Sequence, residues 1–347
     1  EIKETKKVLM GNKNSPNNIN QLISDILEFH VRENKSDWWL FFDRKVKDHN
    51  ELLEDMNAIA ECTKKNYYHD EKGYPILELQ YPEQDFKISE GNQVINLDAP
   101  NIETIGTLTN VNFKDKSITI RGRGKNRPLE EISLGFNLGS DTPIPVNKLR
   151  TALYNFVRNY TTSNNFKSIL SLLNNEAPKF KGSFKLMNAN KSDTAKLAYD
   201  AISNLDNSYI FIQGPPGTGK TYTAAKVISK LLKDGKKIAI TSNSHKAIIQ
   251  LLSTIDEVSD SNFKGLKIFS QSSKGSFYES DNIDAKNQPR PYKKGTKQPL
   301  AFFSGNYQLY ACTKFQLSEQ DLEQEFDYLF IDEAGQVSIA DTIISSM

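Results

Sequence analysis

Two short segments carry residue types and spacings that suit phosphate chemistry. The first reads GPPGTGKT from Gly214 to Thr221 and fits the pattern G-x-x-x-x-G-K-[ST] of a P-loop, or Walker A motif. Glycines let backbone N–H groups approach a polyphosphate, and Lys220 supplies positive charge for its β- and γ-phosphates. The Thr221 hydroxyl can ligate Mg²⁺. We therefore predict an ATP·Mg²⁺ site formed by Gly214, Pro215, Pro216, Gly217, Thr218, Gly219, Lys220, Thr221 and Tyr222.

The second segment is a largely apolar run over 326–331 that ends in the letters DEAGQ. An acidic pair at the end of a strand suits ATP hydrolysis, because Asp332 can hold Mg²⁺ directly or through water and Glu333 can polarise the attacking water. Such a pair can also merely cap a helix. The P-loop elsewhere in the chain favours the catalytic interpretation.

A strand, a loop and a helix must position the first segment. Tyr209 to Ile212 is an apolar run with the length of a buried strand. Over 221–234 apolar residues recur at helical spacing, and Gly235 is a natural end for that helix. The run 237–241 is typical of the next parallel strand. A chance glycine-rich turn is the alternative, but it would usually lack this strand–loop–helix–strand order.

A polar segment follows that second strand. Ser242, Asn243 and Ser244 precede an apolar helix that runs through Leu252. Small polar residues cap helices, and they leave N–H groups suited to an anion, here a nucleic-acid phosphate. Capping alone is the alternative. His245 is more typical of a surface or capping residue than of a catalyst, because no partner for metal ligation or nucleophilic attack lies near it in sequence.

Composition places the chain among ordinary globular proteins. Its 347 residues are enough for two or three domains, with 37% hydrophobic and 25% charged residues. No membrane-length apolar run or secretory signal is present in the sequence. Cys62 and Cys312 are too few for a four-cysteine metal site and indicate a reducing, cytoplasmic compartment. The net charge of +1 does not by itself indicate a nucleic-acid binder, so such binding requires local patches. The chain lacks an initiator Met and stops inside a predicted helix over 340–346, so we expect a fragment of a longer protein.

Residues 1–73 are predicted to form a mostly helical stalk, with helices over 21–30 and 51–65. The run 37–42 (DWWLFF) is the densest aromatic cluster in the chain. Core packing between helices is the favoured interpretation of this cluster, and a stacking platform for bases is the alternative.

Residues 74–142 are predicted to form a small β-barrel. Prolines interrupt short β-like segments, and 114–116 (KDK) reads as a hairpin turn. The clearest strand candidates are 102–108, 111–113 and 117–120. A basic run follows them, and it could be a patch for a nucleic-acid backbone or a solvated loop. It consists of Arg121, Arg123, Lys125 and Arg127.

Residues 143–190 are predicted to return the chain through helices over 146–160 and 166–173. A helix over 191–205 then leads into the P-loop strand. Further on, 259–299 is polar, with one strand expected at 266–269. Its basic residues fit a surface loop or, alternatively, a loop over a nucleic-acid channel; they are Lys286, Arg290, Lys293, Lys294 and Lys297.

Taken in order, GPPGTGKT, TSNSHKAI and DEAGQ resemble the first motor domain of superfamily 1 helicases. The most similar branch holds the nonsense-mediated-decay RNA helicase and the Okazaki-fragment nuclease-helicase. The run FHVRENKSDWW, with IQGPPGTGKTYTAA and SNSHKAI, is similar to bacterial proteins that fuse a RecB-like nuclease to such a helicase. The resemblance implies an α/β fold: a RecA-like P-loop domain over 191–347, an incomplete motor, with a helical stalk and a barrel before it.

The resemblance also implies roles for individual residues and partners. It assigns single-strand contacts to Ser242, Asn243, Ser244, Lys246 and Thr313. It gives Lys220, Asp332 and Glu333 to hydrolysis, and it gives Gln336 the coupling of nucleotide state to the strand. It further implies 5′-to-3′ movement, DNA rather than RNA as the favoured strand, a second motor domain with arginine fingers, and a nuclease domain in the longer protein.

Two features depart from that family. A Gln ahead of the P-loop usually reads adenine, but 188–194 (NANKSDT) contains none. The acid-x-Lys spacing of a nuclease occurs at 1–3 and 85–87 without a supporting acidic cluster. Two other classes remain as alternatives. A hexameric AAA-type ATPase shares GPPGTGKT but normally has a shorter interval to its acidic box, and a nucleic-acid-binding module could carry a non-hydrolysing site.

Overall fold

The computed structural model of this chain divides into two compact units. One unit comprises Glu1–His30 with Val146–Met347, and the other comprises Val31–Pro145. The residues that the structure describes are 6, 9, 18–102, 104–124, 136–143, 145–162, 166–185, 193–260, 262–269, 275–287, 307–318 and 325–347. Within those ranges no helix is both long enough and apolar enough to cross a membrane.

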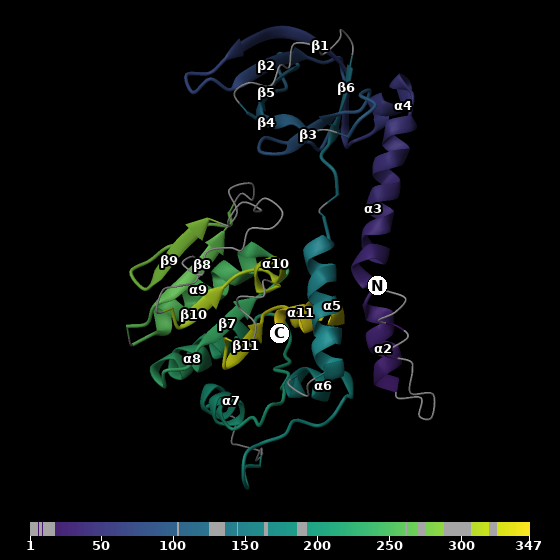
Figure 1. The fold of residues 1–347 in the computed structure, drawn as a ribbon. Helices are drawn as coiled ribbons and strands as arrows, with labels where there is room; N and C mark the ends of the chain where they lie inside the picture. Colours follow the sequence, from purple (N-terminus) through teal and green to yellow (C-terminus); the bar gives the residue numbers. More distant parts are fainter. Residues whose placement is uncertain are drawn as a thin grey trace. The chain divides into compact units, whose positions relative to one another are not determined.

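The unit over 31–145 contains a closed antiparallel β-barrel (Figure 1). Its strand order is β1-β2-β5-β4-β3-β6. The strands are β1 (Ala58–His69), β2 (Pro75–Gln80), β3 (Gln93–Asn96), β4 (Thr104–Asn112), β5 (Ser117–Gly122) and β6 (Phe136–Ser140). In β5, buried residues alternate with partly exposed ones, as expected when one face of a strand fills the barrel. The predicted barrel is therefore present, with the expected turn between β4 and β5, but its first strand, β1, lies before the predicted start at residue 74.

The helix predicted over 51–65 is wrong beyond Glu54. Helix α4 (His49–Glu54) starts with a capping box made by Asp48 and Glu51, and it ends before the barrel begins. Strand β1 then pairs with β2 along one edge and with β6 along the other. Helical spacing in a short apolar run cannot exclude a strand, and these non-local pairings decide the outcome.

The aromatic cluster lies on helix α3 (Phe29–Val46) and is divided between core and solvent. Phe41 is buried with Leu52 and other residues, and Trp38 packs partly against the same cluster. Trp39, by contrast, is 66% exposed. The core interpretation is therefore confirmed for Phe41 and wrong for Trp39.

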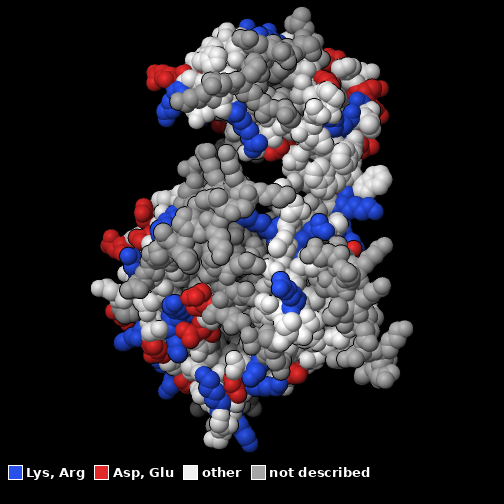
Figure 2. Space-filling model, viewed as in Figure 1, with Lys and Arg blue, Asp and Glu red and all other residues white. Residues whose placement is uncertain are grey.

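The basic run begins inside β5, and its first residue has an acidic partner. Arg121 Nε donates to Asp70 Oδ2 at 2.8 Å, and its guanidinium lies over the Tyr74 ring. Arg123 donates to the side chain of Gln93. Lys125 and Arg127 lie outside the described residues. On the face drawn in Figure 2, the described acidic and basic side chains are interspersed, in keeping with the small net charge.

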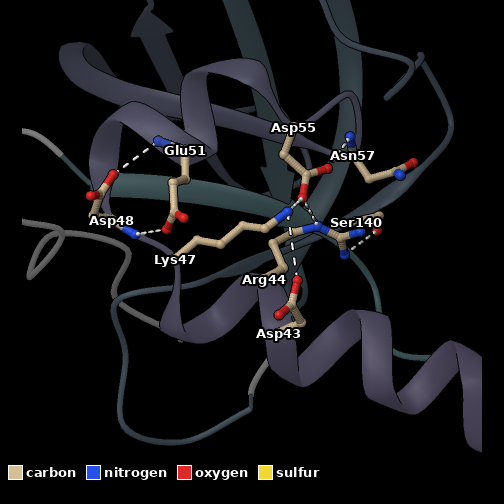
Figure 3. A network of polar contacts seen from close by, with 8 residues as sticks. All are labelled: Asp43, Arg44, Lys47, Asp48, Glu51, Asp55, Asn57 and Ser140. Carbon is tan, nitrogen blue, oxygen red and sulfur yellow. Dashed lines mark hydrogen bonds and ion pairs between the residues drawn. The ribbon is translucent and has the colours of Figure 1, made fainter.

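A polar network ties the end of α3 to the barrel (Figure 3). Asp55 accepts hydrogen bonds from Arg44 Nε at 3.2 Å and from Lys47 Nζ at 2.8 Å. Arg44 also donates to Ser140 Oγ, on β6, at 3.3 Å. The Arg44 and Asp55 side chains are almost fully buried, so this is an internal ion pair rather than a surface one.

The other unit is built around a parallel sheet, which in the described residues has the order β11-β7-β10-β8-β9 (Figure 1). Every paired strand runs parallel to its neighbour. The strands are β7 (Ile238–Thr241), β8 (Gly265–Phe269), β9 (Ile283–Asn287), β10 (Leu309–Ala311) and β11 (Tyr328–Ile331). The strands expected at 237–241, 266–269 and 326–331 are therefore confirmed as β7, β8 and β11. β9 was not predicted, because its sequence IDAKN has little apolar character.

Helices complete the sheet unit on both faces. Ile238 and Ile240 of β7 pack with α7 (Thr194–Ser203), α8 (Lys220–Lys233) and α9 (His245–Val258). Ala239, between them, joins a separate cluster with Tyr310 on the opposite face. This alternation follows the period of two along a strand. A further core joins α2 (Asn18–Ile26), α5 (Asn147–Thr162), α6 (Lys167–Leu173) and α11 (Ile339–Ser345).

Tyr209 to Ile212, predicted to be a buried strand, is not a strand in this structure. Phe211 is 67% exposed, and Ile212 is 41% exposed. The Tyr209 hydroxyl donates to the Glu176 carbonyl at 2.8 Å. The run is therefore attached to the sheet unit by side-chain contacts of this kind rather than by a strand ladder.

Candidate functional site

Glycines and one threonine set the shape of the P-loop. Gly217 and Gly219 adopt φ values of 77° and 79°, which L-residues rarely reach. Thr218 Oγ1 donates to the Pro215 carbonyl at 2.8 Å and closes the turn. A Cβ added at Gly214 would lie 2.7 Å from Thr218 Oγ1, so a side chain there would open the turn. The loop thus needs glycine at all three positions.

Helix α8 begins at Lys220, directly after this loop. No side chain caps its N-terminus, and its first turn carries no acidic residue. Its leading N–H groups and its dipole therefore favour an anion. Lys220 Nζ donates to the carbonyls of Gly214 at 2.7 Å and Pro215 at 3.0 Å, which holds the ammonium against the loop. Tyr222, two residues on, is half exposed beside the same helix end.

The acidic pair lies at the carboxyl end of β11. Ile331 is in register with Thr241 of β7, and the Asp332 N–H donates to the Thr241 carbonyl at 3.0 Å. Burial raises the pKa of Asp332, repulsion from Glu333 adds to this, and the charge of Lys220 opposes it. The charge of Lys220 thus favours the ionised form of Asp332.

Glu333 is held in a strained backbone conformation. Its φ of 54° lies in the left-handed region, which is unfavourable for a residue with a side chain. A short 3₁₀ turn over Ala334–Gln336 follows, and the Glu333 side chain is exposed. Strain of this kind is concentrated at functional sites, where the surrounding structure imposes it.

Mg²⁺ at such a site would need few protein ligands. Within the described residues, no group of three or more His, Cys, Asp and Glu side chains is arranged to hold a metal ion. Mg²⁺ bound with phosphates usually takes only one or two protein oxygens and keeps its other positions for phosphate and water. The Thr221 hydroxyl and the Asp332 carboxylate fit that donor set.

The residues assigned to strand contacts differ in what they offer. Ser244 Oγ accepts from the Ala247 N–H at 3.1 Å and caps α9, as the capping interpretation predicted. Ser242 is only 5% exposed. Asn243 is exposed, and its side-chain amide donates to the Gln336 carbonyl. Lys246 is also exposed, which makes it the assigned residue with the most accessible charge.

Thr313 is already engaged within its own helix. Its hydroxyl and its N–H both donate to the Gln316 side chain, which forms a capping box at the start of α10 (Lys314–Leu317). A strand phosphate could reach the Thr313 hydroxyl only in competition with Gln316.

The sequence analysis did not identify a buried lysine on β8 that contacts His245. Lys267 of β8 is completely buried, and its Nζ donates to the Ile268 carbonyl at 2.6 Å. The same Nζ lies 3.2 Å from Nδ1 of His245, the first residue of α9. Burial lowers the pKa of Lys267 to about 8 and that of His245 to about 4. The only signal in the sequence is a lysine inside the apolar strand GLKIF.

Comparisons with known proteins agree with the predicted class. The family described as Type III restriction enzyme, res subunit, matches residues 162–342. The RecBCD enzyme subunit RecD of Buchnera aphidicola subsp. Acyrthosiphon pisum (strain APS) is 28% identical over 229 residues, which are 61% of this chain and 32% of that protein. The DNA replication ATP-dependent helicase/nuclease DNA2 of Saccharomyces cerevisiae (strain ATCC 204508 / S288c) is 34% identical over 92 residues, which are 23% of this chain and 6% of that protein.

Fold and site together define a mixed α/β protein with a helicase-type domain. Because its match covers more than half of the sequence, the chain belongs to the family described as Type III restriction enzyme, res subunit. The predicted resemblance to superfamily 1 helicases is confirmed. The chain spans about a third or less of the length of these two relatives. A solved structure of the siderophore interacting protein from Acinetbacter baumannii is matched at a TM-score of 0.25 and 12% identity, over 83% of this chain and 94% of that one, which is too low to support any inference.

Proposed function

We propose that this chain is the ATP-binding first motor domain of an ATP-dependent nucleic-acid helicase. The proposal rests on the placement of Lys220 at the uncapped start of α8 and of Asp332 directly after β11, the strand in register with β7. ATP would lie along Gly214–Tyr222, with its phosphates on the leading N–H groups of α8. Mg²⁺, when bound, supplies positive charge to the phosphates.

The protein's own residues divide the work of hydrolysis. Lys220 would neutralise charge on the β- and γ-phosphates, and Thr221 and Asp332 would hold the metal ion. Glu333 would orient and polarise the attacking water. Gln336 would sense the nucleotide and pass its state to the strand, since its carbonyl already accepts from Asn243.

The strand would run along the carboxyl edge of the sheet. Asn243 and Lys246 offer an amide and a charge at the surface, and Ser242, Ser244 and Thr313 lie in the same end segments. We propose single-stranded DNA rather than RNA, because the name of the yeast relative specifies DNA replication. The proposed 5′-to-3′ movement rests on the resemblance to superfamily 1 helicases. A cytoplasmic location, a second motor domain and a nuclease domain in a longer protein belong to the same proposal.

The first experiment measures nucleotide binding to the chain as it stands. A fluorescent ATP analogue with Mg²⁺ should bind the wild type, and Lys220→Ala should weaken binding at least tenfold. Lys233→Ala removes a lysine from the last turn of the same helix and should leave binding unchanged. Equal affinity of Lys220→Ala and wild type would remove the basis of the proposal.

Hydrolysis by this chain alone should be weak, and unwinding should be absent. Catalysis in the proposed class requires arginine fingers from the second motor domain, which stabilise charge in the transition state. Phosphate release measured with and without a single-stranded oligonucleotide tests this. Brisk strand-stimulated turnover would show that the chain needs no second domain.

A further inference from the structure

Lys267 is a buried cation without an acidic partner in the described part of the chain. Its Nζ contacts there are the Ile268 carbonyl at 2.6 Å and His245 Nδ1 at 3.2 Å. The other titratable group that acts on it is the buried thiol of Cys312, on the segment after β10. Burying an ammonium away from water is unfavourable, and an apolar side chain would suit this strand better. Such a residue calls for a functional explanation.

The chemistry of the two side chains fixes the form of the imidazole. A lysine ammonium has three N–H donors and no acceptor, so Nδ1 of His245 must accept its hydrogen bond. A neutral imidazole that accepts at Nδ1 carries its hydrogen on Nε2. The ring stays neutral at physiological pH, because burial and the adjacent Lys267 charge lower the pKa of His245 to about 4.

His245 is partly exposed. In the described ranges no hydrogen bond to His245 Nε2 is found, and this atom is not among the buried polar atoms that lack a partner. His245 follows directly after Ser242, Asn243 and Ser244, and Lys246 comes next. His245 therefore lies among the residues proposed to meet the strand.

We propose that Lys267 orients His245 as a neutral hydrogen-bond donor, whose Nε2–H binds an oxygen of the single-stranded nucleic acid. His245 is the contacting residue and Lys267 is the positioning residue. The inference rests on the proposed helicase function and adds a residue to its strand-binding edge.

Strand affinity tests this directly. The probe is a fluorescein-labelled oligodeoxythymidine, followed by anisotropy at fixed salt. His245→Ala and Lys267→Met should each weaken binding about fivefold, whereas His245→Gln, which keeps an N–H donor, should recover most of the loss. Lys264→Met removes an exposed lysine just before β8 and serves as the charge control, with unchanged affinity expected.

A second readout reports the ring itself and does not depend on the oligonucleotide. Nitrogen-15 NMR of the imidazole should show Nε2–H and a bare Nδ1 in the wild type from pH 5.5 to 7.5. Lys267→Met should release the ring, so that its tautomers mix and its pKa rises toward the ordinary value. Wild-type affinity should also stay flat between pH 6 and 7.5, whereas a histidine that binds by charge would gain affinity on acidification.

The outcomes separate this inference from the function beneath it. If wild-type protein binds the strand and both His245→Ala and Lys267→Met bind equally well, His245 is not a contact and the inference fails alone. A protonated or Nδ1–H ring in the wild type would also overturn it. If wild-type protein binds ATP but no strand at all, the helicase proposal and this inference fall together.

Discussion

The side-chain amide of Asn243 donates a hydrogen bond to the backbone carbonyl of Gln336. Asn243 lies in the segment after β7, and Gln336 ends the 3₁₀ turn that follows the acidic pair. The bond therefore joins the proposed strand-binding segment to the proposed nucleotide-sensing turn. The neighbouring strands β7 and β11 are already in register, so a small shift at one end can be transmitted to the other.

Removing this hydrogen bond should weaken the coupling between strand binding and ATP binding more than it weakens either binding activity. In Asn243→Asp the side chain keeps its size but loses the N–H donor. We expect ATP affinity to stay unchanged and the effect of a bound strand on ATP affinity to fall about fivefold, which corresponds to about 1 kcal/mol for one hydrogen bond. Paired titrations of ATP with and without oligonucleotide measure this. Full coupling in Asn243→Asp would contradict the assignment.

Asp332→Asn should stabilise the protein in the absence of nucleotide. Burial is the main reason that the pKa of Asp332 is raised, so the folded state binds more protons than the unfolded chain between the two pKa values. The ionised group thus opposes folding at neutral pH, and the penalty is relieved as pH falls. We expect a gain of about 1 kcal/mol from the neutral amide.

Thermal unfolding at pH 7 measures that gain in stability. A second measurement with Mg²⁺·ATP compares how much the ligand stabilises each protein. The ligand should raise the melting temperature of the wild type but add much less to Asp332→Asn, which lacks the metal-binding carboxylate. Asp260→Asn alters an exposed acid after α9 and should behave as wild type. A lower melting temperature for apo Asp332→Asn would show that the carboxylate is structural.

Glu333 offers a test of stored strain. Its left-handed φ of 54° suits glycine, so Glu333→Gly should be more stable than Glu333→Gln by about 1 kcal/mol. Both variants lack the carboxylate, and both should bind ATP but not hydrolyse it. Chemical denaturation ranks their stabilities, and phosphate release checks activity. Equal stability of the two variants would mean that the strain is relieved elsewhere.

Local patterns predicted most elements of this chain but few of its long-range contacts. The P-loop, α8 and the acidic box follow from spacing alone, because each is encoded in a short continuous segment. β1 was mistaken for a helix and β9 was missed, since partners distant in sequence decide both strands. The opposite error occurs at Tyr209 to Ile212, where a strand is predicted and none is present. An apolar run does not specify what it packs against.

The candidate site shows the same division. Lys220, Asp332 and Glu333 were identified because their motifs are contiguous in sequence. The contact between Lys267 and His245 joins a strand to the start of a helix, and no local sequence pattern near either residue predicts it. Contacts of this kind depend on which elements lie side by side in the fold, and the periodicity of a single segment does not determine that.

The polar network around Asp55 should make the barrel sensitive to acid. Burial acts to raise the pKa of Asp55, but hydrogen bonds from Lys47 and the Asn57 N–H, together with the Arg44 charge, lower it overall. A carboxyl group with a lowered pKa in the folded state adds stability at neutral pH, and this contribution is lost as the pH falls below about 4. Asp55→Asn should therefore lack, already at pH 7, the stability that the wild type loses in acid.

The expected loss in Asp55→Asn is about 3 kcal/mol, because the buried Arg44 would be left without its counter-charge. Hydrogen exchange at the amides of β1 and β6 measures it, since Arg44 also holds Ser140 of β6. Asp43→Asn is the control: its side chain is 62% exposed and 3.7 Å from Lys47, so the change should be below about 0.5 kcal/mol. If both variants exchange like the wild type, the network does not stabilise the barrel, and the burial of Arg44 must be balanced by its other contacts.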